Sequence, residues 1–167
     1  MSGSIPLRQF IRDSGDVGPV VGILESQRLP RSVPGITART LDGSMMTTVS
    51  GLLDEFTRRW DLAKTAGRNR DALDDAMRDL DGPAVSAGRP TPDGYLTRIV
   101  HADAILTSAP DELGWFAESL VFYRDHYRDH TRPAASFGVL LLTLPTLRES
   151  VADRWRAVGV TPAEVTG

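Results

Sequence analysis

The chain of 167 residues contains no cysteine, which excludes disulfide cross-links and thiol chemistry. No apolar run approaches the roughly 18–20 residues that span a bilayer. The first residues also lack a basic region followed by an apolar one, so we expect a cytoplasmic protein with no membrane contact. There is no Gly-x-Ser-x-Gly elbow and no glycine-rich phosphate loop. We therefore expect neither an enzyme nor a bound cofactor.

The composition is that of a small globular protein. Apolar residues make up 41 % of the chain, which is enough for a core without covalent cross-links. The length predicts one domain. With 22 acidic residues against 19 basic ones, the net charge is −3. This mild acidic excess argues against direct binding to nucleic acid and suits a basic protein partner.

Three strand patterns alternate with helical patterns in the middle of the chain. Residues 36–41, 95–101 and 137–144 are strand-like, and the last of these runs is almost wholly apolar. Residues 48–60 and 108–129 carry apolar side chains at helical spacing. Strands separated by helices predict right-handed crossovers and an α/β fold, with a small parallel sheet of about three strands and flanking helices.

The two ends of the chain give weaker patterns. Residues 17–24 are strand-like, but Pro19 and two glycines interrupt them, which predicts an edge strand or an extended segment packed on the core. Near the other end, Thr146-x-x-Glu149 is typical of a capping box that opens a last helix. We therefore divide the chain into an N-terminal extension (1–34), a central domain (35–144) and an additional C-terminal helix and tail (145–167).

One stretch of the central domain, residues 67–82, combines a loop, a helix with an N-cap residue and a signal that ends the helix. Asn69 is a good N-cap residue, and Gly82-Pro83 is expected to end the helix. On a helix, apolar residues then fall on one face: Leu73, Ala76, Met77 and Leu80. Acidic residues fall on the other: Asp71, Asp74, Asp75 and Asp79. Asp71 and Asp75 stand one turn apart on the same side, where like charges oppose helix stability.

The stretch Gly67-x-Asn69-x-Asp71-Ala72-Leu73-x-Asp75 resembles the G-x-N-x-D-A-L-x-D pattern of the barstar family, which are intracellular protein inhibitors of secreted ribonucleases. The family has the same order of strand, turn, helix, loop and acidic helix, and the resemblance covers residues 35–144. It implies a barstar-like sheet, to which the C-terminal helix would be an addition.

The resemblance also implies a function and a site. The partner would be a secreted or toxin ribonuclease, whose basic active site the acidic helix enters as a mimic of the RNA phosphate. Asp75 matches the family's main aspartate and Asp71 the supporting one. Gly67 and Asn69 match the loop that makes backbone contacts and caps the helix. Asp74 and Asp79 extend the same acidic face, and no metal is implied.

Some positions depart from the family pattern. Thr65 and Ala66 stand where the family often has aromatic residues, and Arg68 and Arg70 add positive charge at the rim of the site. Both features predict a lower binding affinity for a basic partner protein. The family also supplies an acidic residue from the later helix. Here the candidates are Asp125 and Asp129.

Two other readings of the sequence stay open. The first is a barstar-fold interaction module without nuclease inhibition, whose aspartates are only the solvated outer face of a helix. The second, a metal-dependent hydrolase, rests on His126 and His130, which are spaced i, i+4 as metal ligands often are. The helix that carries them has no HExxH glutamate, and the repeated Tyr-Arg-Asp-His pattern is typical of an ordinary charged helix end.

Overall fold

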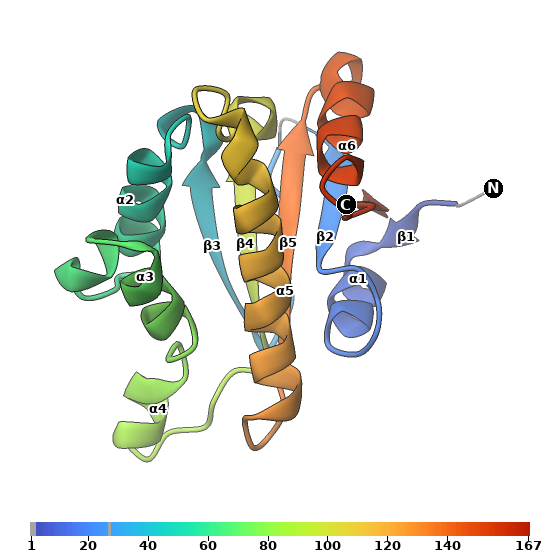
Figure 1. The fold of residues 1–167 in the computed structure, drawn as a ribbon. Helices are drawn as coiled ribbons and strands as arrows, with labels where there is room; N and C mark the ends of the chain where they lie inside the picture. Colours follow the sequence, from blue (N-terminus) through green and yellow to red (C-terminus); the bar gives the residue numbers. More distant parts are fainter. Residues whose placement is uncertain (1–2, 27) are drawn as a thin grey trace.

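The computed structural model describes residues 3–26 and 28–167. Its centre is a six-stranded parallel sheet in the order β1-β6-β2-β5-β4-β3 (Figure 1). The strands are β1 (Ile5–Pro6), β2 (Val21–Glu25), β3 (Ile36–Asp42), β4 (Gly94–Val100), β5 (Ser136–Thr143) and β6 (Ala163–Thr166). The α/β class and the parallel sheet are as expected. The expectation of about three strands is wrong, because segments from both ends of the chain continue the sheet beyond β5.

Helices cover the two faces of the sheet unequally. The α-helices are α1 (Leu7–Ser14), α2 (Val49–Arg59), α3 (Arg70–Met77), α4 (Gly82–Ser86), α5 (Leu113–Asp129) and α6 (Arg148–Arg156). Short 3-10 turns are η1 (Gly43–Met45), η2 (Lys64–Gly67), η3 (Ala102–Ala104), η4 (Pro110–Glu112) and η5 (Pro145–Leu147). In Figure 1, α5 and α6 stand in front of the sheet, and α2 and α3 lie to the left of β3. All four of these front helices contribute to one core with the sheet. None of the helices in the described part of the chain is both long enough and apolar enough to cross a membrane.

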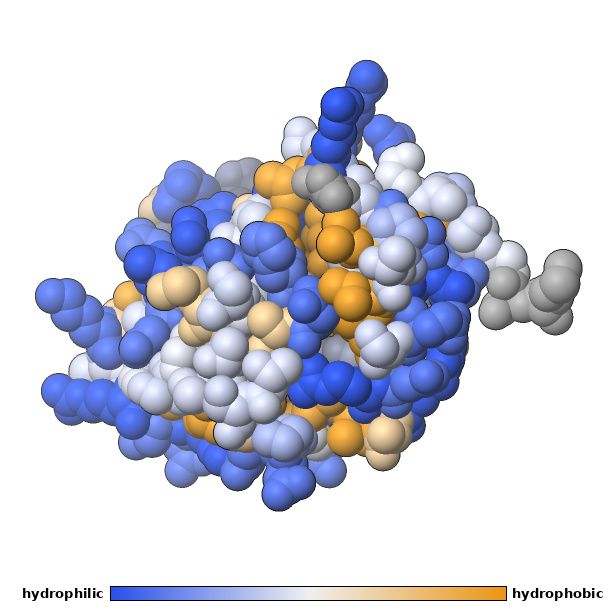
Figure 2. Space-filling view, turned by 90° about the horizontal axis from the view of Figure 1, so that it is seen from above, coloured by the Kyte–Doolittle hydropathy of each residue, from blue (hydrophilic) through white to orange (hydrophobic). Residues whose placement is uncertain are grey.

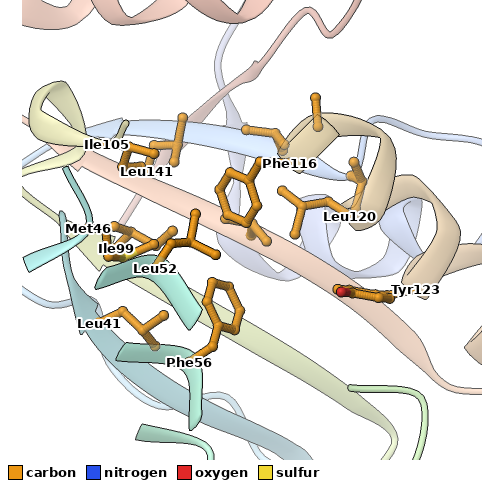
Figure 3. Packing of buried hydrophobic residues seen from close by; sticks show 14 of the residues in the cluster. Leu41, Met46, Leu52, Phe56, Ile99, Ile105, Phe116, Leu120, Tyr123 and Leu141 are labelled. Carbon is orange, nitrogen blue, oxygen red and sulfur yellow. The ribbon is translucent and has the colours of Figure 1, made fainter. Parts of the chain in front are cut away.

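The larger core lies between the sheet and these front helices. Figure 3 shows Phe56 of α2 and Phe116 of α5 converging in it. Their rings meet edge-on, with centroids 5.8 Å apart. The apolar stripe predicted for the helix over 108–129 is confirmed, because its five members are all buried: Leu113, Phe116, Leu120, Tyr123 and Tyr127.

A smaller core lies on the opposite face, under α1. Phe10 is fully buried there and belongs to one apolar cluster with Leu140 and Leu142 of β5. Their neighbours Val139 and Leu141 belong to the front core. Every residue of β5 is buried, as predicted for an apolar strand covered on both faces.

The segment 17–24, expected at an edge of the sheet, instead supplies β2, which pairs with β5 on one side and β6 on the other. Gly22 explains the difference. A Cβ atom at Gly22 would stand 2.8 Å from Val165 and 3.0 Å from the Phe10 ring, so glycine lets strand and helix approach closely. Pro19, the other apparent obstacle, precedes the strand.

Two helix ends also differ from the prediction. The acidic helix ends at Met77, not at Gly82, and Gly82-Pro83 begins another short helix, α4. Proline suits the first turn of a helix as well as it suits a stop. The capping box of Thr146 and Glu149 does not form, because η5 comes first and α6 begins at Arg148 without a side-chain cap.

Candidate protein-binding site on the acidic helix

The acidic helix α3 begins as its sequence predicts. The side chain of Asn69 accepts a hydrogen bond of 2.8 Å from the backbone N–H of Ala72, which confirms it as the N-cap. Leu73 and Met77 are buried against the front core. Asp71 lies in the first turn, where the helix dipole favours a negative charge. The apolar face thus fixes which side of α3 its aspartates present.

Gly67 joins this helix to α2 through η2. A Cβ atom at this position would stand 3.3 Å from both the Asp54 carboxylate and the Thr57 hydroxyl of α2. The absent side chain therefore allows the loop to lie close against α2. Gly67 thus has a packing role, and its close contact with α2 positions Asn69 at the start of α3.

Two tyrosines of α5 hold α3 in place. The Tyr127 hydroxyl donates to the Met77 carbonyl at 2.5 Å and accepts from the Leu80 N–H at 2.9 Å. It thereby satisfies backbone groups that become free where the helix ends. The Tyr123 hydroxyl donates to the Asp74 carboxylate at 2.5 Å. Burial and the neighbouring Asp74 charge raise the pKa of Tyr123 far above its ordinary value, so it stays a neutral donor.

The four predicted aspartates therefore do not form one uniform face. Asp71 is exposed, and no cation of the described chain lies within 4 Å of its carboxylate. Asp75 is 80 % exposed and pairs through one oxygen with Arg78 at 2.8 Å. Asp74 is turned toward Tyr123 and anchors the helix. Asp79 is exposed, but its carboxylate lies beside the backbone at Gly82, after α3 has ended.

Arg78 links the acidic helix to an exposed aromatic ring. Its guanidinium pairs with Asp75 and lies 4.8 Å from the centroid of the Phe122 ring of α5. Phe122 is 47 % exposed, although large aromatic side chains are usually buried. Sequence reasoning missed this residue. The available signal was its place outside the buried stripe of the 108–129 helix.

The positive charge predicted at the rim is partly neutralised. Arg70 pairs with Glu112 at 2.8 Å, and its guanidinium stacks 4.4 Å from the centroid of the Trp115 ring. Arg70 is therefore held against the start of α5. Arg68 remains exposed.

The acidic candidates on α5 face another direction. Asp125 pairs with Arg124 at 2.7 Å, and Asp129 pairs with Arg128 at 2.9 Å. Arg124 and Arg128 donate in turn to the carbonyls of Gly18 and Asp16, which precede β2. Neither aspartate is brought next to α3. Both are instead neutralised where α5 meets the N-terminal segment.

The two histidines of α5 lie side by side, with ring centroids 6.1 Å apart. Burial and the nearby Arg78 charge lower the pKa of His126. Within residues 3–26 and 28–167, no group of three or more acidic or histidine side chains is arranged to hold a metal ion. The third ligand that a hydrolytic metal site requires is thus not assembled around this pair.

Beside Phe122, a shallow groove of about 400 Å³ separates α5 from the turn that follows α6. Its walls include Val121 and Val158, and Glu118 and Asp125 stand at its rim. The exposed surface therefore runs from the carboxylates of α3, across the Phe122 ring, into an apolar groove.

Comparison with protein-family models shows to which family this chain belongs. The family model described as Barstar (barnase inhibitor) matches residues 36–138, more than half of the chain. The chain belongs to the barstar family. The match runs from β3 into β5 and includes all of α3. The barstar region thus contains the acidic helix, whereas β1, β2, β6, α1 and α6 lie outside it.

Other comparisons concern the whole fold. Comparison with curated proteins found no match. The chain is similar to the solved structure of the Aeropyrum pernix ORC2 protein in its ADPNP and ADP complexes, with a TM-score of 0.54 and 14 % identity. The likeness covers 95 % of this chain and 45 % of that one, so this barstar relative spans less than half of ORC2. At this identity it is a likeness of fold alone.

Proposed function

We propose that the protein is an inhibitor of a ribonuclease or nuclease toxin, and that α3 blocks the basic active site of that enzyme. Membership of the barstar family supports a ribonuclease as the class of partner. Because such an inhibitor protects the interior of the cell that makes it, we place it in the cytoplasm. It acts by binding a protein and neither cleaves nor holds RNA itself.

The observation that carries this proposal is the exposure of Asp71 and Asp75 on a helix fixed from behind. Both carboxylates are exposed, while Asn69, Tyr123 and Tyr127 hold the backbone beneath them. Clefts that bind RNA phosphates are rich in arginine and lysine, which form charge-assisted hydrogen bonds with carboxylates. A preformed pair of carboxylates loses little conformational entropy when it enters such a cleft.

The Arg78 ion pair does not remove this binding surface. Only one oxygen of Asp75 is engaged, and an ion pair this exposed contributes about 0–1 kcal/mol. An arginine of the partner can therefore bond to the second oxygen or displace Arg78. Arg78 also contacts the Phe122 ring, so the Asp75 carboxylate and that ring lie on one surface.

Phe122 supplies an aromatic contact that the loop before α3 lacks. Aromatic anchors surrounded by polar groups contribute much of the binding energy in protein interfaces. Neither loop position offers an aromatic ring, because the residues there are Thr65, which is exposed, and Ala66, which is buried. We assign this role to Phe122, which lies on α5 beside the Asp75–Arg78 pair.

The test is titration of a barnase-like ribonuclease with the purified chain. We expect inhibition at a 1:1 ratio, and Asp75→Asn is expected to raise Kd more than 30-fold. Removing one charge of a desolvated pair typically costs about 2–5 kcal/mol. That range comes in part from the barnase–barstar complex, so it is the size of effect known for this family and not a value derived from this chain.

Asp153→Asn is the matched control, because Asp153 is also an exposed helical aspartate paired with the arginine three residues later, at 2.7 Å. The control is expected to inhibit like the wild type, and affinity should fall as salt rises, because exposed charges are screened. Equal effects of the two substitutions would reject α3 as the binding element.

A second function is favoured by the missing loop aromatics. The chain would then be a barstar-fold interaction module that binds a partner other than a nuclease through the same surface. If no barnase-like enzyme is inhibited while Phe122→Ala abolishes capture of a partner from the source cell, this second function holds.

A further inference from the structure

A cavity of about 990 Å³ opens at the carboxyl ends of β2 and β6. These strands lie toward the β1 end of the sheet, whereas α3 lies near β3 at the other end (Figure 1). The walls of the cavity come from the start of α1, the end of β2, the segment of residues 28–33, Arg148 and the end of β6. All these residues lie outside the region that matches the family, residues 36–138. The volume is near the upper end of the range for small-molecule sites.

The cavity lies at the edge of the sheet where ligands commonly bind. In open parallel sheets, ligands bind outside the carboxyl ends of the strands. Here the segment that leaves β2 toward β3 and the end of β6 form its walls at that edge. Figure 2 looks onto this edge of the sheet and shows a stripe of hydrophobic residues among hydrophilic ones.

Four arginines contribute to the lining, but only one of them is neutralised. Arg148 pairs with Glu164 at 2.6 Å and also with Glu25, the two acidic residues of the lining. The other three arginines have no acidic partner within 4 Å in the described chain, and they are Arg8, Arg28 and Arg31. The cavity therefore keeps an excess of positive charge although the whole chain carries −3.

The start of α1 adds to this positive potential. The helix follows Pro6, which gives no side-chain cap, and its first turn has no acidic residue. The first N–H groups and the positive end of the helix dipole therefore face the cavity without an acceptor from a capping side chain.

The rest of the wall is part polar and part apolar. Four of its residues carry hydroxyl groups: Ser4, Ser26, Ser32 and Thr166. Leu7, Leu24 and Val165 are buried beneath the wall, while Leu29 stands at the rim, 47 % exposed, and Pro30 and Val33 are partly exposed. Inorganic phosphate would leave this apolar surface in contact with water. A ligand that suits the cavity needs an apolar body as well as a negative charge.

We propose that the cavity binds a small organic anion in which an apolar body carries a phosphate or carboxylate group. The anionic group lies near the start of α1, between Arg8 and Arg31, because arginine bonds to such groups in bidentate fashion. The apolar body lies against Leu29, Pro30 and Val33. This site is independent of the proposed nuclease inhibition, because it shares no residue with α3 or α5.

The test uses anilinonaphthalene sulfonate as a fluorescent anionic probe and octyl phosphate, below its micelle concentration, as the competitor. We expect saturable 1:1 binding of the probe and full displacement by octyl phosphate. Inorganic phosphate and octanol, which each carry half of the ligand chemistry, are expected to compete at least tenfold more weakly. No saturable binding, or equal competition by octanol, would overturn the proposal.

The variant Arg8→Gln/Arg31→Gln is expected to bind octyl phosphate at least tenfold more weakly at an unchanged Tm. The control Arg89→Gln/Arg132→Gln removes the same charge from two exposed arginines outside the cavity and is expected to bind normally. If both double variants lose binding equally, the cavity is not the site. Binding to vesicles of anionic phospholipid without displacement by octyl phosphate would also overturn the proposal, because the ligand would then be a membrane surface.

Discussion

The sheet joins a region that matches the barstar family and flanking segments that do not, and the two differ in the charge that they present. The region that matches the barstar family supplies β3, β4 and the start of β5, and it presents carboxylates on α3. The flanking segments supply β1, β2 and β6, and they enclose a cavity lined by arginines. The two regions share β5, whose faces belong to different cores. A small family fold has thus been extended by strand pairing into a larger sheet with a second concave surface.

The largest expected effect tests whether the two regions unfold together. Phe10 is fully buried between α1 and the strands, so Phe10→Ala should lower the free energy of unfolding by about 3–5 kcal/mol. We expect one transition in urea, monitored by both tryptophan fluorescence and far-UV circular dichroism. The control Phe122→Ala, at an exposed ring, should lower it by less than about 1 kcal/mol. Two separate transitions for Phe10→Ala would show that the regions are independent.

The next effect tests how closely the flanking strand and helix pack. Gly22→Ala places a methyl group 2.8 Å from Val165 and should destabilise the protein by about 1–3 kcal/mol. Gly114→Ala is the control, because outside its own helix the nearest atom of the described chain to its Cβ position belongs to Val158, at an ordinary contact distance of 3.8 Å. In α5 this change should raise stability by up to about 1 kcal/mol. Thermal unfolding distinguishes the two signs, and a neutral Gly22→Ala would contradict the packing given for β2.

Within the family-matched region, the hydrogen bond between Tyr123 and Asp74 should make a measurable contribution. Tyr123→Phe leaves a partly buried carboxylate without its donor and should lower the free energy of unfolding by about 1–3 kcal/mol. In the double variant with Asp74→Ala, the two losses should not add, because each removes the same bond. Fully additive losses, measured in urea, would mean that the bond does not hold α3.

The smallest effect concerns acid stability. Burial opposes the charge of Glu55, but hydrogen bonds from the Asp42 N–H and Arg58, with the charge of Arg59, outweigh burial and lower the pKa of Glu55. Because the folded pKa is lowered, this stabilisation is present above an unfolded pKa of about 4.5 and is lost as pH falls through the folded value. Glu55→Gln should therefore reduce stability at pH 7 more than at pH 3. A constant difference across urea transitions at several pH values would contradict this assignment.

The sequence predicts the family-matched region well because its signals are local. The N-cap at Asn69, the stripe through Phe116 and Tyr127, and the apolar strand β5 each follow from the spacing of neighbouring residues. The G-x-N-x-D-A-L-x-D pattern then identifies the family, which the match over residues 36–138 confirms.

The rest depends on contacts between distant segments. Gly22 weakens β2 as an isolated strand, yet it is what allows Phe10 to pack there. β1 and β6 are two and four residues long and form only by pairing with each other and with β2. The orientation of α5 likewise decides that Phe122, and not Asp125, lies beside α3. No local spacing contains that information.

Competition at the nuclease active site tests the inhibitory mechanism most directly. The Kd of the chain for a barnase-like ribonuclease is measured by calorimetry at increasing concentrations of a mononucleotide that occupies the phosphate site. If α3 enters that site, the apparent Kd rises linearly with the mononucleotide concentration, and Asp75→Asn raises Kd at every mononucleotide concentration by the same factor. A tight complex whose Kd does not change with mononucleotide would place the interface elsewhere and contradict the proposed role of Asp71 and Asp75.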